Sequence, residues 1–156
     1  MSSTPQVSLR PMTEDEFAEW YELTIVGYAG AIGPARALTD EEALAQARKE
    51  IETLLPDGLA TKDHLVWTAC TPDGSVVGNL WIQARKPVPF IFNVEVDAAQ
   101  RGHGYGRAIM LAGEQACRDL GFDRLDLNVF NDNPTAVRLY DSLGYVTVAQ
   151  SMRKVL

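Results

Sequence analysis

Three alternating glycines mark the junction between an apolar run and a helical pattern in the second half of the chain. The stretch VEVDAAQRGHGYGRAIM, residues 94–110, places Gly102, Gly104 and Gly106 directly before the sequence becomes helical. Glycine weakens the interior of both strands and helices, so three of them at one junction need a reason. A strand, a glycine-rich turn and a helix together predict a βα unit whose helix start exposes unpartnered backbone N–H groups.

Exposed N–H groups at a helix start attract anions, and glycine leaves room for a phosphate to reach them. The turn is therefore a candidate phosphate site, although tight turns also use glycine for conformational reasons alone. An NTP-binding loop needs Lys and then Ser or Thr after its last glycine, whereas Arg107 and Ala108 follow here. A dinucleotide fingerprint needs a third glycine at a spacing that this turn lacks. Both of these phosphate-binding classes are excluded.

Two amphipathic helices are predicted in the first third of the chain, each opening with a capping box. Thr13 with Glu16, and Thr39 with Glu42, have the spacing at which the two residues cap each other's backbone N–H. Apolar residues then recur at helical intervals. The first helix is expected to break within residues 30–34, which contain two glycines and a proline.

The rest of the pattern predicts a sheet, with two apolar runs around the turn TPDG forming a hairpin. Asn133 is expected to cap a short helix, with Pro134 at its favoured first position. A strand, a helix and a strand in succession imply a parallel pair joined by a right-handed crossover. The expected strands are residues 7–12, 64–70, 75–84, 89–96, 123–130 and 145–156. The fold class is therefore α/β or α+β with a mixed sheet.

Composition limits the class of protein and its partners. The chain has 156 residues, 46% of them hydrophobic and 22% charged, which is typical of one soluble globular domain. Its start does not resemble a signal peptide, and no apolar run is long enough to span a membrane. A net charge of −7 without a basic block argues against general nucleic-acid binding. Cys70 and Cys117 lack metal-ligand spacing, so buried free thiols in a reducing, cytoplasmic compartment and no metal site are expected.

Two motifs resemble those of the GNAT superfamily of acyl-CoA-dependent N-acyltransferases. The order V-x-A-x-x-R-G-H-G-Y-G, from Val96 to Gly106, is similar to the superfamily signature R/Q-x-x-G-x-G/A. The string N-x-x-A-x-x-L-Y-x-x-x-G-Y begins at Asn133, 27 residues after Gly106. The resemblance covers about residues 6–156. It implies a GNAT fold, a mostly antiparallel mixed sheet with a central splayed parallel strand pair and helices on both faces, as a single domain over residues 1–156.

The resemblance further implies transfer of an acetyl group from acetyl-CoA to a primary amine by direct attack in a ternary complex. Backbone groups of residues 101–107 would hold the pyrophosphate of coenzyme A. A β-bulge near residues 94–96 would splay the parallel strands, and this segment would pair with the pantetheine arm, which Asn133 would also contact. The implied coenzyme-binding residues are Val94, Glu95, Val96, Arg101, Gly102, His103, Gly104, Tyr105, Gly106, Arg107, Asn133 and Tyr140.

Tyr140 occupies the position of the general acid in this resemblance. A phenol with a pKa near 10 is a reasonable acid toward a departing thiolate of similar basicity. The alternative is that its ring only packs in the core, because Val137, Leu139 and Leu143 surround it in the sequence. The donor to the carbonyl oxygen would be a backbone N–H near Val96.

Glu95 is the candidate base. Strand alternation predicts Asn93 and Glu95 on one face of the sheet, and Phe92 with two valines on the other. A carboxylate on a central strand is unusual: it either deprotonates the ammonium, directly or through water, or is tied to a backbone group or an arginine. Several relatives carry a glutamate at the position of Asn128, which cannot act as a base. This departure puts transfer of their mechanism, and of their N-terminal peptide substrate, in doubt.

The acceptor class is a small-molecule or protein amine, and Tyr28, at the end of the first helix, is the candidate residue to contact it. The competing functions are a non-catalytic acyl-CoA-binding or sensing domain and a transferase for another acyl group. A toxin-like transferase acting on charged tRNA is disfavoured by the acidic balance. A homodimer is one assembly open to the chain, and no membrane partner is expected.

Overall fold

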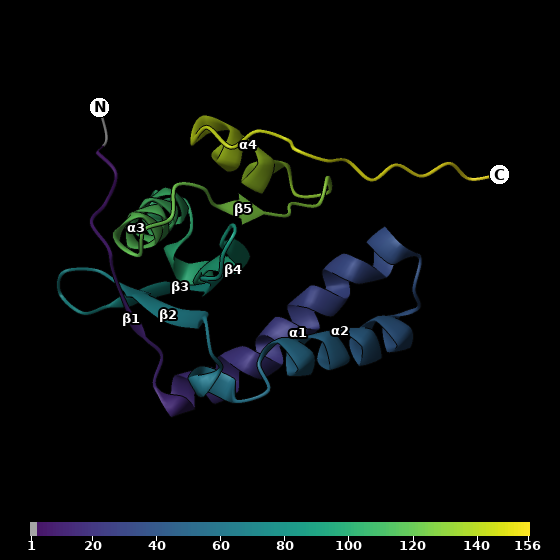
Figure 1. The fold of residues 1–156 in the computed structure, drawn as a ribbon, viewed down its shortest axis with the longest axis horizontal. Coiled ribbons are helices and arrows are strands. Elements are labelled where there is room, and N and C mark those ends of the chain that lie inside the picture. The colour runs from purple at the N-terminus through teal and green to yellow at the C-terminus, as the bar shows by residue number, and fades with distance from the viewer. Residues whose placement is uncertain (1–2) are drawn as a thin grey trace.

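The computed structural model describes residues 3–156, and it places five strands in one sheet with helices on both faces (Figure 1). The sheet order β1-β2-β3-β4-β5 follows the chain. The strands are β1 (Ser8–Pro11), β2 (His64–Cys70), β3 (Val76–Gln83), β4 (Phe90–Val96) and β5 (Asp126–Leu127). The helices are α1 (Glu14–Arg36), α2 (Asp40–Leu54), α3 (Tyr105–Asp119) and α4 (Pro134–Ser142), with 3-10 turns at Gly58–Ala60 and Ala98–Gln100. The predicted fold class is confirmed.

Strands β1 to β4 are antiparallel neighbours, and β4 and β5 are parallel. The predicted hairpin joins β2 to β3, and its turn is closed by the Thr71 N–H donating to the Ser75 carbonyl at 2.9 Å. Helix α3 carries the chain from the end of β4 back to the start of β5, so the glycine turn lies at the carboxyl end of β4. This is the edge at which α/β sheets bind ligands.

Each face of the sheet has its own apolar core. Helices α1 and α2 cover one face, where Ile25, Ile32 and Ile51 pack with Trp81. Helices α3 and α4 cover the other face, where Ile109 and Met110 are fully buried. Cys70 and Cys117 are buried and free, as predicted.

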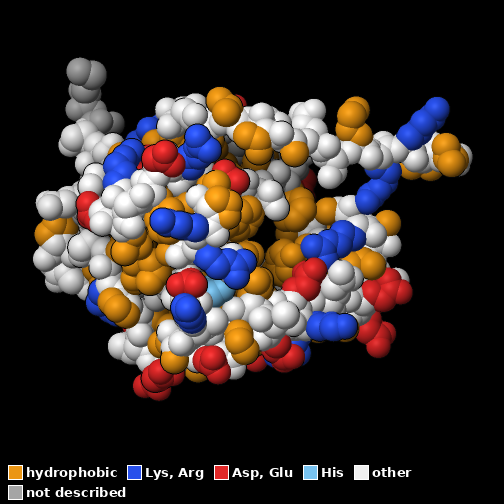
Figure 2. Space-filling model, viewed as in Figure 1, with side chains coloured by type: hydrophobic (Ala, Val, Ile, Leu, Met, Phe, Trp, Pro, Cys, Tyr) orange, Lys and Arg blue, Asp and Glu red, His pale blue; other side chains and the backbone are white. Residues whose placement is uncertain are grey.

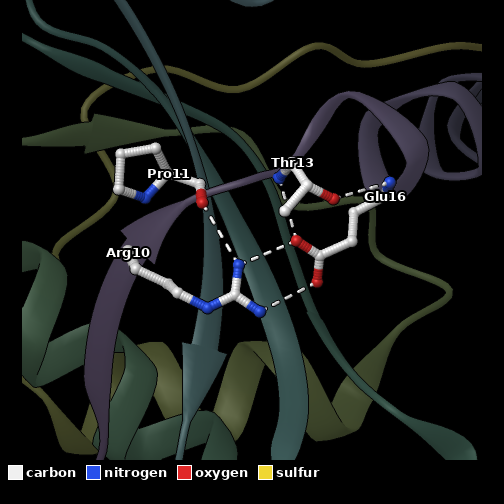
Figure 3. A network of polar contacts seen from close by, with 4 residues as sticks. All are labelled: Arg10, Pro11, Thr13 and Glu16. Carbon is white, nitrogen blue, oxygen red and sulfur yellow. Dashed lines mark hydrogen bonds and ion pairs between the residues drawn. The ribbon is translucent and has the colours of Figure 1, made fainter.

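An arginine from β1 reinforces the start of α1 (Figure 3). Thr13 and Glu16 form the predicted capping box, and the Arg10 guanidinium donates to both Glu16 carboxylate oxygens at 2.7 and 3.1 Å. The same guanidinium donates to the Pro11 carbonyl at 3.2 Å. Arg10 lowers the pKa of Glu16 to about 2, so this carboxylate is charged and capping throughout the neutral range.

Helix α1 does not break at the predicted position. It continues through the two glycines and Pro34 and ends at Arg36, with Ala37 in the left-handed conformation at φ 57°. Pro34 lies in the last turn, so only the final part of the hydrogen-bond ladder loses a donor. Gly33 is buried, and a Cβ there would lie 3.5 Å from the Ala43 Cβ of α2. Close packing of the two helices therefore overrides the local preference for a break.

The predicted last strand, residues 145–156, is wrong. Residues 146–156 form neither strand nor helix, and Figure 1 shows them as an extended tail leading away from α4. Arg153 near its end donates to the Pro34 carbonyl at 3.4 Å and to the Ala35 carbonyl, which holds the tail at the end of α1. The strand predicted at residues 123–130 is also too long. Only Asp126 and Leu127 pair with β4, and no strand of residues 3–156 pairs with the other side of β5. The parallel pair therefore lies at the edge of the sheet, and its predicted central position is wrong because no strand pairs on the outer side of β5 within residues 3–156.

Gly78 of β3 is required by the close approach of β4. A Cβ at this position would lie 2.1 Å from the Glu95 carbonyl oxygen and 2.9 Å from Ile109 Cδ1. We therefore expect Gly78→Ala to lower the free energy of unfolding by about 3 kcal/mol, measured by chemical denaturation. Gly30→Ala is the control, since Gly30 is exposed on α1 with nothing within 4 Å, and it should stabilise by about 0.5–1 kcal/mol. A Gly78→Ala protein as stable as wild type would contradict this close approach.

Candidate active site

The turn between β4 and α3 presents a row of unpartnered backbone N–H groups. None of residues 101–107 donates its backbone N–H to another group of residues 3–156. Gly102 and Gly104 have φ of +79° and +83°, a region where side chains are strained. Gly104 is the N-cap of α3, so the positive end of the helix dipole acts on the same turn. The turn has the geometry of an anion cradle.

The side chains of the turn contact its own flanks. Arg101 Nε donates to the Val96 carbonyl at 3.2 Å, and Arg101 Nη2 lies 4.0 Å from Glu95 Oε1. His103 Nδ1 contacts the Gln100 carbonyl at 3.1 Å. The side chains of Arg101 and His103 are thus held by neighbouring groups, and the backbone amides are left to face a ligand.

Gly106 brings three elements together at the start of α3. A Cβ placed there would lie 3.4 Å from Leu139 Cδ2 and 3.7 Å from Val96 Cγ2. Leu139 belongs to α4 and Val96 ends β4, so the turn, the strand and α4 meet at this residue. Arg107 adds a second link to α4 by donating to Ser142 Oγ. Of the three glycines, two adopt the left-handed conformation and the third permits this close packing.

One backbone edge of β4 is open next to the turn. β4 pairs with β5 only at Phe90 and Ile91, whereas its other edge pairs with β3 as far as Val96. Residues 92–96 therefore keep donors and acceptors without a β5 partner, and an extended ligand can pair with such an edge.

A β-bulge changes the face that Phe92 presents. The register of β3 and β4 shifts next to Trp81, which pairs with Asn93 and leaves Phe92 as the extra residue. The Phe92 ring stacks on Trp81 at 4.7 Å, and Asn93 Nδ2 donates to Asn79 Oδ1 at 3.3 Å on the same face. The sequence predicted Phe92 and Asn93 on different faces of the sheet. This is wrong, because a bulge inserts one residue into the strand and resets the alternation.

Tyr140 lies on α4 beside the turn. Its ring packs against the α3 face of the sheet and meets the Tyr145 ring edge-on at 5.9 Å. Burial raises the pKa of Tyr140 above the usual 10, so the hydroxyl stays protonated at neutral pH. This hydroxyl makes no hydrogen bond within residues 3–156, and it is not one of the fully buried unpaired atoms there. A packed ring with a free hydroxyl accommodates both predicted roles.

Glu95 lies near the carboxyl end of β4 with its side chain 51% exposed. Its strand partner is Asn79, and its carboxylate lies 4.0 Å from the Arg101 guanidinium. Both predicted roles, base and arginine partner, are compatible with this placement.

Two other predicted residues are engaged by the protein itself. Asn133 caps α4 as predicted, with its Oδ1 accepting from the Ala136 N–H at 3.2 Å. Arg36 Nη2 donates to the Tyr28 hydroxyl at 3.0 Å, and Arg36 Nη1 lies 2.9 Å from Glu50 Oε1. Arg36 thus joins Tyr28 to Glu50 of α2. The predicted place of Tyr28 at the end of the first helix is wrong, because α1 continues for eight more residues, to Arg36.

The sequence analysis did not predict the contacts of His64 with Trp81 and Phe92. Its Nδ1 accepts from Trp81 Nε1 at 2.9 Å, and its ring stacks with Phe92 at 6.0 Å. Burial and the nearby Arg85 lower the pKa of His64, so the ring is neutral at pH 7. Because the indole nitrogen only donates, the His64 proton sits on Nε2. The hairpin register pairs Trp81 with Val66, which makes His64 its diagonal neighbour, and this signal could have identified the pair.

The helix pair and the sheet also share a partly buried polar contact. Trp20 Nε1 of α1 donates to Asn79 Oδ1 at 3.1 Å, the same oxygen that accepts from Asn93. Figure 2 shows a hollow bordered by hydrophobic side chains between the sheet and the helix pair.

Within residues 3–156, no three His, Cys, Asp or Glu side chains gather to hold a metal ion. None of the helices there has the length and apolar character needed to cross a bilayer.

The acetyltransferase (GNAT) family model matches residues 35–145. The chain belongs to the acetyltransferase (GNAT) family. It is 31% identical to the uncharacterized N-acetyltransferase YdgE of Bacillus subtilis, over 96% of this chain and 98% of that protein. It is 32% identical to YycN of the same organism, over 96% and 99%.

The crystal structure of this GNAT relative YycN superposes with a TM-score of 0.92 and covers 97% of the present chain and 99% of its own. A mycothiol acetyltransferase of Nocardiopsis dassonvillei is 37% identical over 90% of this chain, which spans 46% of that protein. The predicted family is confirmed.

Proposed function

We propose that this GNAT protein transfers an acetyl group from acetyl-CoA to a primary amine. The observation that carries this is the row of free N–H groups at residues 101–107 directly beside the open edge of β4 at residues 92–96. A pyrophosphate fits the first and an extended pantetheine arm fits the second, in the order in which they occur in coenzyme A. The same proposal includes the remaining predicted coenzyme contacts, a single domain over residues 1–156 and a cytoplasmic location.

On this proposal, the neutral amine nitrogen attacks the thioester carbonyl carbon, a C–N bond forms and the C–S bond breaks. The nitrogen loses one further proton to solvent as the amide forms. The Tyr140 hydroxyl gives its proton to the departing sulfur and is reprotonated from solvent. A backbone N–H near Val96 donates to the carbonyl oxygen as negative charge develops there. The ammonium proton leaves before the attack, to Glu95 or to ordered water.

An acceptor screen with detection of the released thiol tests this function. The protein is incubated with acetyl-CoA and polyamines, amino sugars or peptide amines, and acetylated product is confirmed by mass spectrometry. Longer acyl-CoA donors run in parallel test the alternative acyl group. Tight acetyl-CoA binding without thiol release for any amine would support the non-catalytic binding domain instead.

Replacing Glu95 by Gln tests the base. A solvated amine with a pKa near 10 is mostly charged at pH 7, so some group must take its proton. If Glu95 does so, Glu95→Gln keeps the shape and removes the basicity. The pH profile of kcat/KM should then lose its acidic limb, and activity should recover as pH rises and free amine becomes available.

Asp97→Asn is the control, because it removes a carboxylate two residues away and should leave the profile unchanged. Loss of the Arg101 contact should cost Glu95→Gln less than about 1 kcal/mol of stability, since that ion pair is exposed. A Glu95→Gln protein with full activity and a wild-type profile would leave ordered water as the proton acceptor.

A further inference from the structure

Three polar side chains form a chain of hydrogen bonds from α1 to the open edge of β4. Trp20 Nε1 of α1 donates to Asn79 Oδ1 at 3.1 Å, and Asn93 Nδ2 of β4 donates to the same oxygen at 3.3 Å. Trp20 is buried, and both asparagines are partly buried. The two amides therefore lie on the face of the sheet that α1 and α2 cover.

The indole nitrogen fixes the direction in which both amides point. An indole N–H only donates, so the Asn79 atom that it contacts is the carbonyl oxygen. That oxygen only accepts, so Asn93 must give it the amide nitrogen, and the Asn93 carbonyl oxygen is turned away. This oxygen accepts no hydrogen bond from residues 3–156, and it is not one of the fully buried unpaired atoms there. It is therefore open to a ligand.

The packing of the protein does not by itself require an amide at position 93. Asn79 already accepts the Trp20 N–H, so Asn93 is not needed to satisfy the indole. Asn93 pairs with Trp81 across the sheet and follows Phe92, whose ring stacks on Trp81 at 4.7 Å. Asparagine is depleted in strands, and a polar group among aromatic rings costs free energy unless it is hydrogen-bonded. A fixed carbonyl oxygen in this setting suits a bound N–H donor.

Asn93 lies on the side from which an acceptor amine has access. It belongs to residues 92–96, whose outer edge has no β5 partner and to which the proposed function assigns the pantetheine arm. The opposite face of the sheet is closed by α3, where Ile109 and Met110 are fully buried. The hollow in Figure 2 lies between the Asn93 face and the helix pair. An amine therefore reaches a thioester at this edge past Asn93.

We propose that Asn93 Oδ1 accepts a hydrogen bond from the attacking amine, and that Trp20 and Asn79 hold it in that orientation. This role rests on the proposed acetyl transfer. A neutral primary amine has two N–H groups and one lone pair, so donating one N–H to Asn93 leaves the lone pair to face the thioester carbonyl carbon. Positive charge develops on the nitrogen as the C–N bond forms, and the amide dipole stabilises it. Asn93 takes no proton, since the nitrogen loses its proton to solvent.

Two substitutions of Asn93 test the contact. The probe is the polyamine, amino sugar or peptide amine that gives the most product in the acceptor screen. Asn93→Leu removes the carbonyl at similar volume, and Asn93→Ala removes it with a side chain too small to block the amine. Both should lower kcat/KM for this amine by about 10- to 100-fold, the range for one hydrogen bond to a group that becomes charged. Acetyl-CoA affinity, measured by calorimetry, should stay within twofold of wild type.

A double-mutant cycle tests the positioning role of Trp20. Trp20→Phe keeps an aromatic ring beside Trp81, which Trp20 meets edge-on at 5.4 Å, and removes the N–H that orients Asn79. It should lower kcat/KM for the amine by about 3- to 10-fold in wild type, and by less than about twofold in Asn93→Leu, where no amide remains to be oriented. Trp67→Phe is the control, since Trp67 packs on the other face of the sheet and its loss should leave the amine kinetics unchanged.

The outcomes separate this role from the acetyl transfer on which it rests. If Asn93→Leu and Asn93→Ala keep wild-type kcat/KM, the carbonyl oxygen does not contact the amine and the proposal is overturned. An equal loss from Trp20→Phe in both backgrounds would overturn the positioning role, because a packing defect does not depend on Asn93. A wild type that releases no thiol with any amine would instead overturn the proposed acetyl transfer, and this role with it.

Discussion

Replacing Tyr140 by Phe is expected to lower kcat by about 10- to 1,000-fold, with little change in acetyl-CoA affinity. The substitution keeps the buried ring and removes only the hydroxyl, which has no partner within residues 3–156. A packing role needs the ring, whereas proton donation to the departing sulfur needs the hydroxyl. Steady-state kinetics at saturating acetyl-CoA, with calorimetry for affinity, separate the two roles.

Tyr145→Phe is the matched control for this experiment. Tyr145 contacts Tyr140 ring to ring, and its hydroxyl donates to Glu114, so losing it should cost about 1 kcal/mol of stability and leave kcat within twofold. The pH dependence adds a second readout. Burial raises the pKa of Tyr140, so its deprotonation should produce an alkaline limb above pH 10 that the Phe variant lacks. If Tyr140→Phe turns over within a factor of about two of wild type, Tyr140 serves packing alone.

Local signals in the sequence located most of the elements that build the site. Both capping boxes, the hairpin turn and the Asn133 cap depend on residues close in sequence, and each forms as predicted. The glycine turn was found in the same way, because strand, glycines and helix adjoin in the chain. The two family motifs then predicted that α4 lies beside this turn. The contact of Leu139 with the Gly106 position shows that α4 and the turn are neighbours.

The errors occurred where distant parts of the chain decide the outcome. Phe92 changes face because β3 and β4 shift register beside Trp81, and no period-two pattern contains that information. Helix α1 passes Pro34 because Gly33 packs against α2. The tail has the alternation of a strand, yet it pairs with no strand of residues 3–156. Strand character is local, whereas strand pairing is not.

Gly104→Val is expected to weaken acetyl-CoA binding by about 10- to 100-fold, measured by calorimetry. Gly104 has φ of +83°, which strains any side chain, and a Cβ there would lie 3.1 Å from Pro5 Cδ. The valine would also project at the start of α3, among the free N–H groups of residues 101–107. Losing one hydrogen bond to a charged phosphate costs about 1.5–3 kcal/mol, which corresponds to roughly this range.

Backbone strain alone would lower the stability of the protein without affecting acetyl-CoA binding directly. The control must therefore carry the same backbone strain at a position away from the turn. Gly121 follows the other end of α3, has φ of +91° and has nothing within 4 Å of a Cβ. Gly121→Val should therefore lose a similar amount of stability and bind acetyl-CoA with wild-type affinity. If Gly104→Val keeps wild-type affinity, the pyrophosphate does not dock on these amides, and the glycines of the turn serve the fold alone. If both variants lose affinity equally, the effect is destabilisation rather than a blocked cradle.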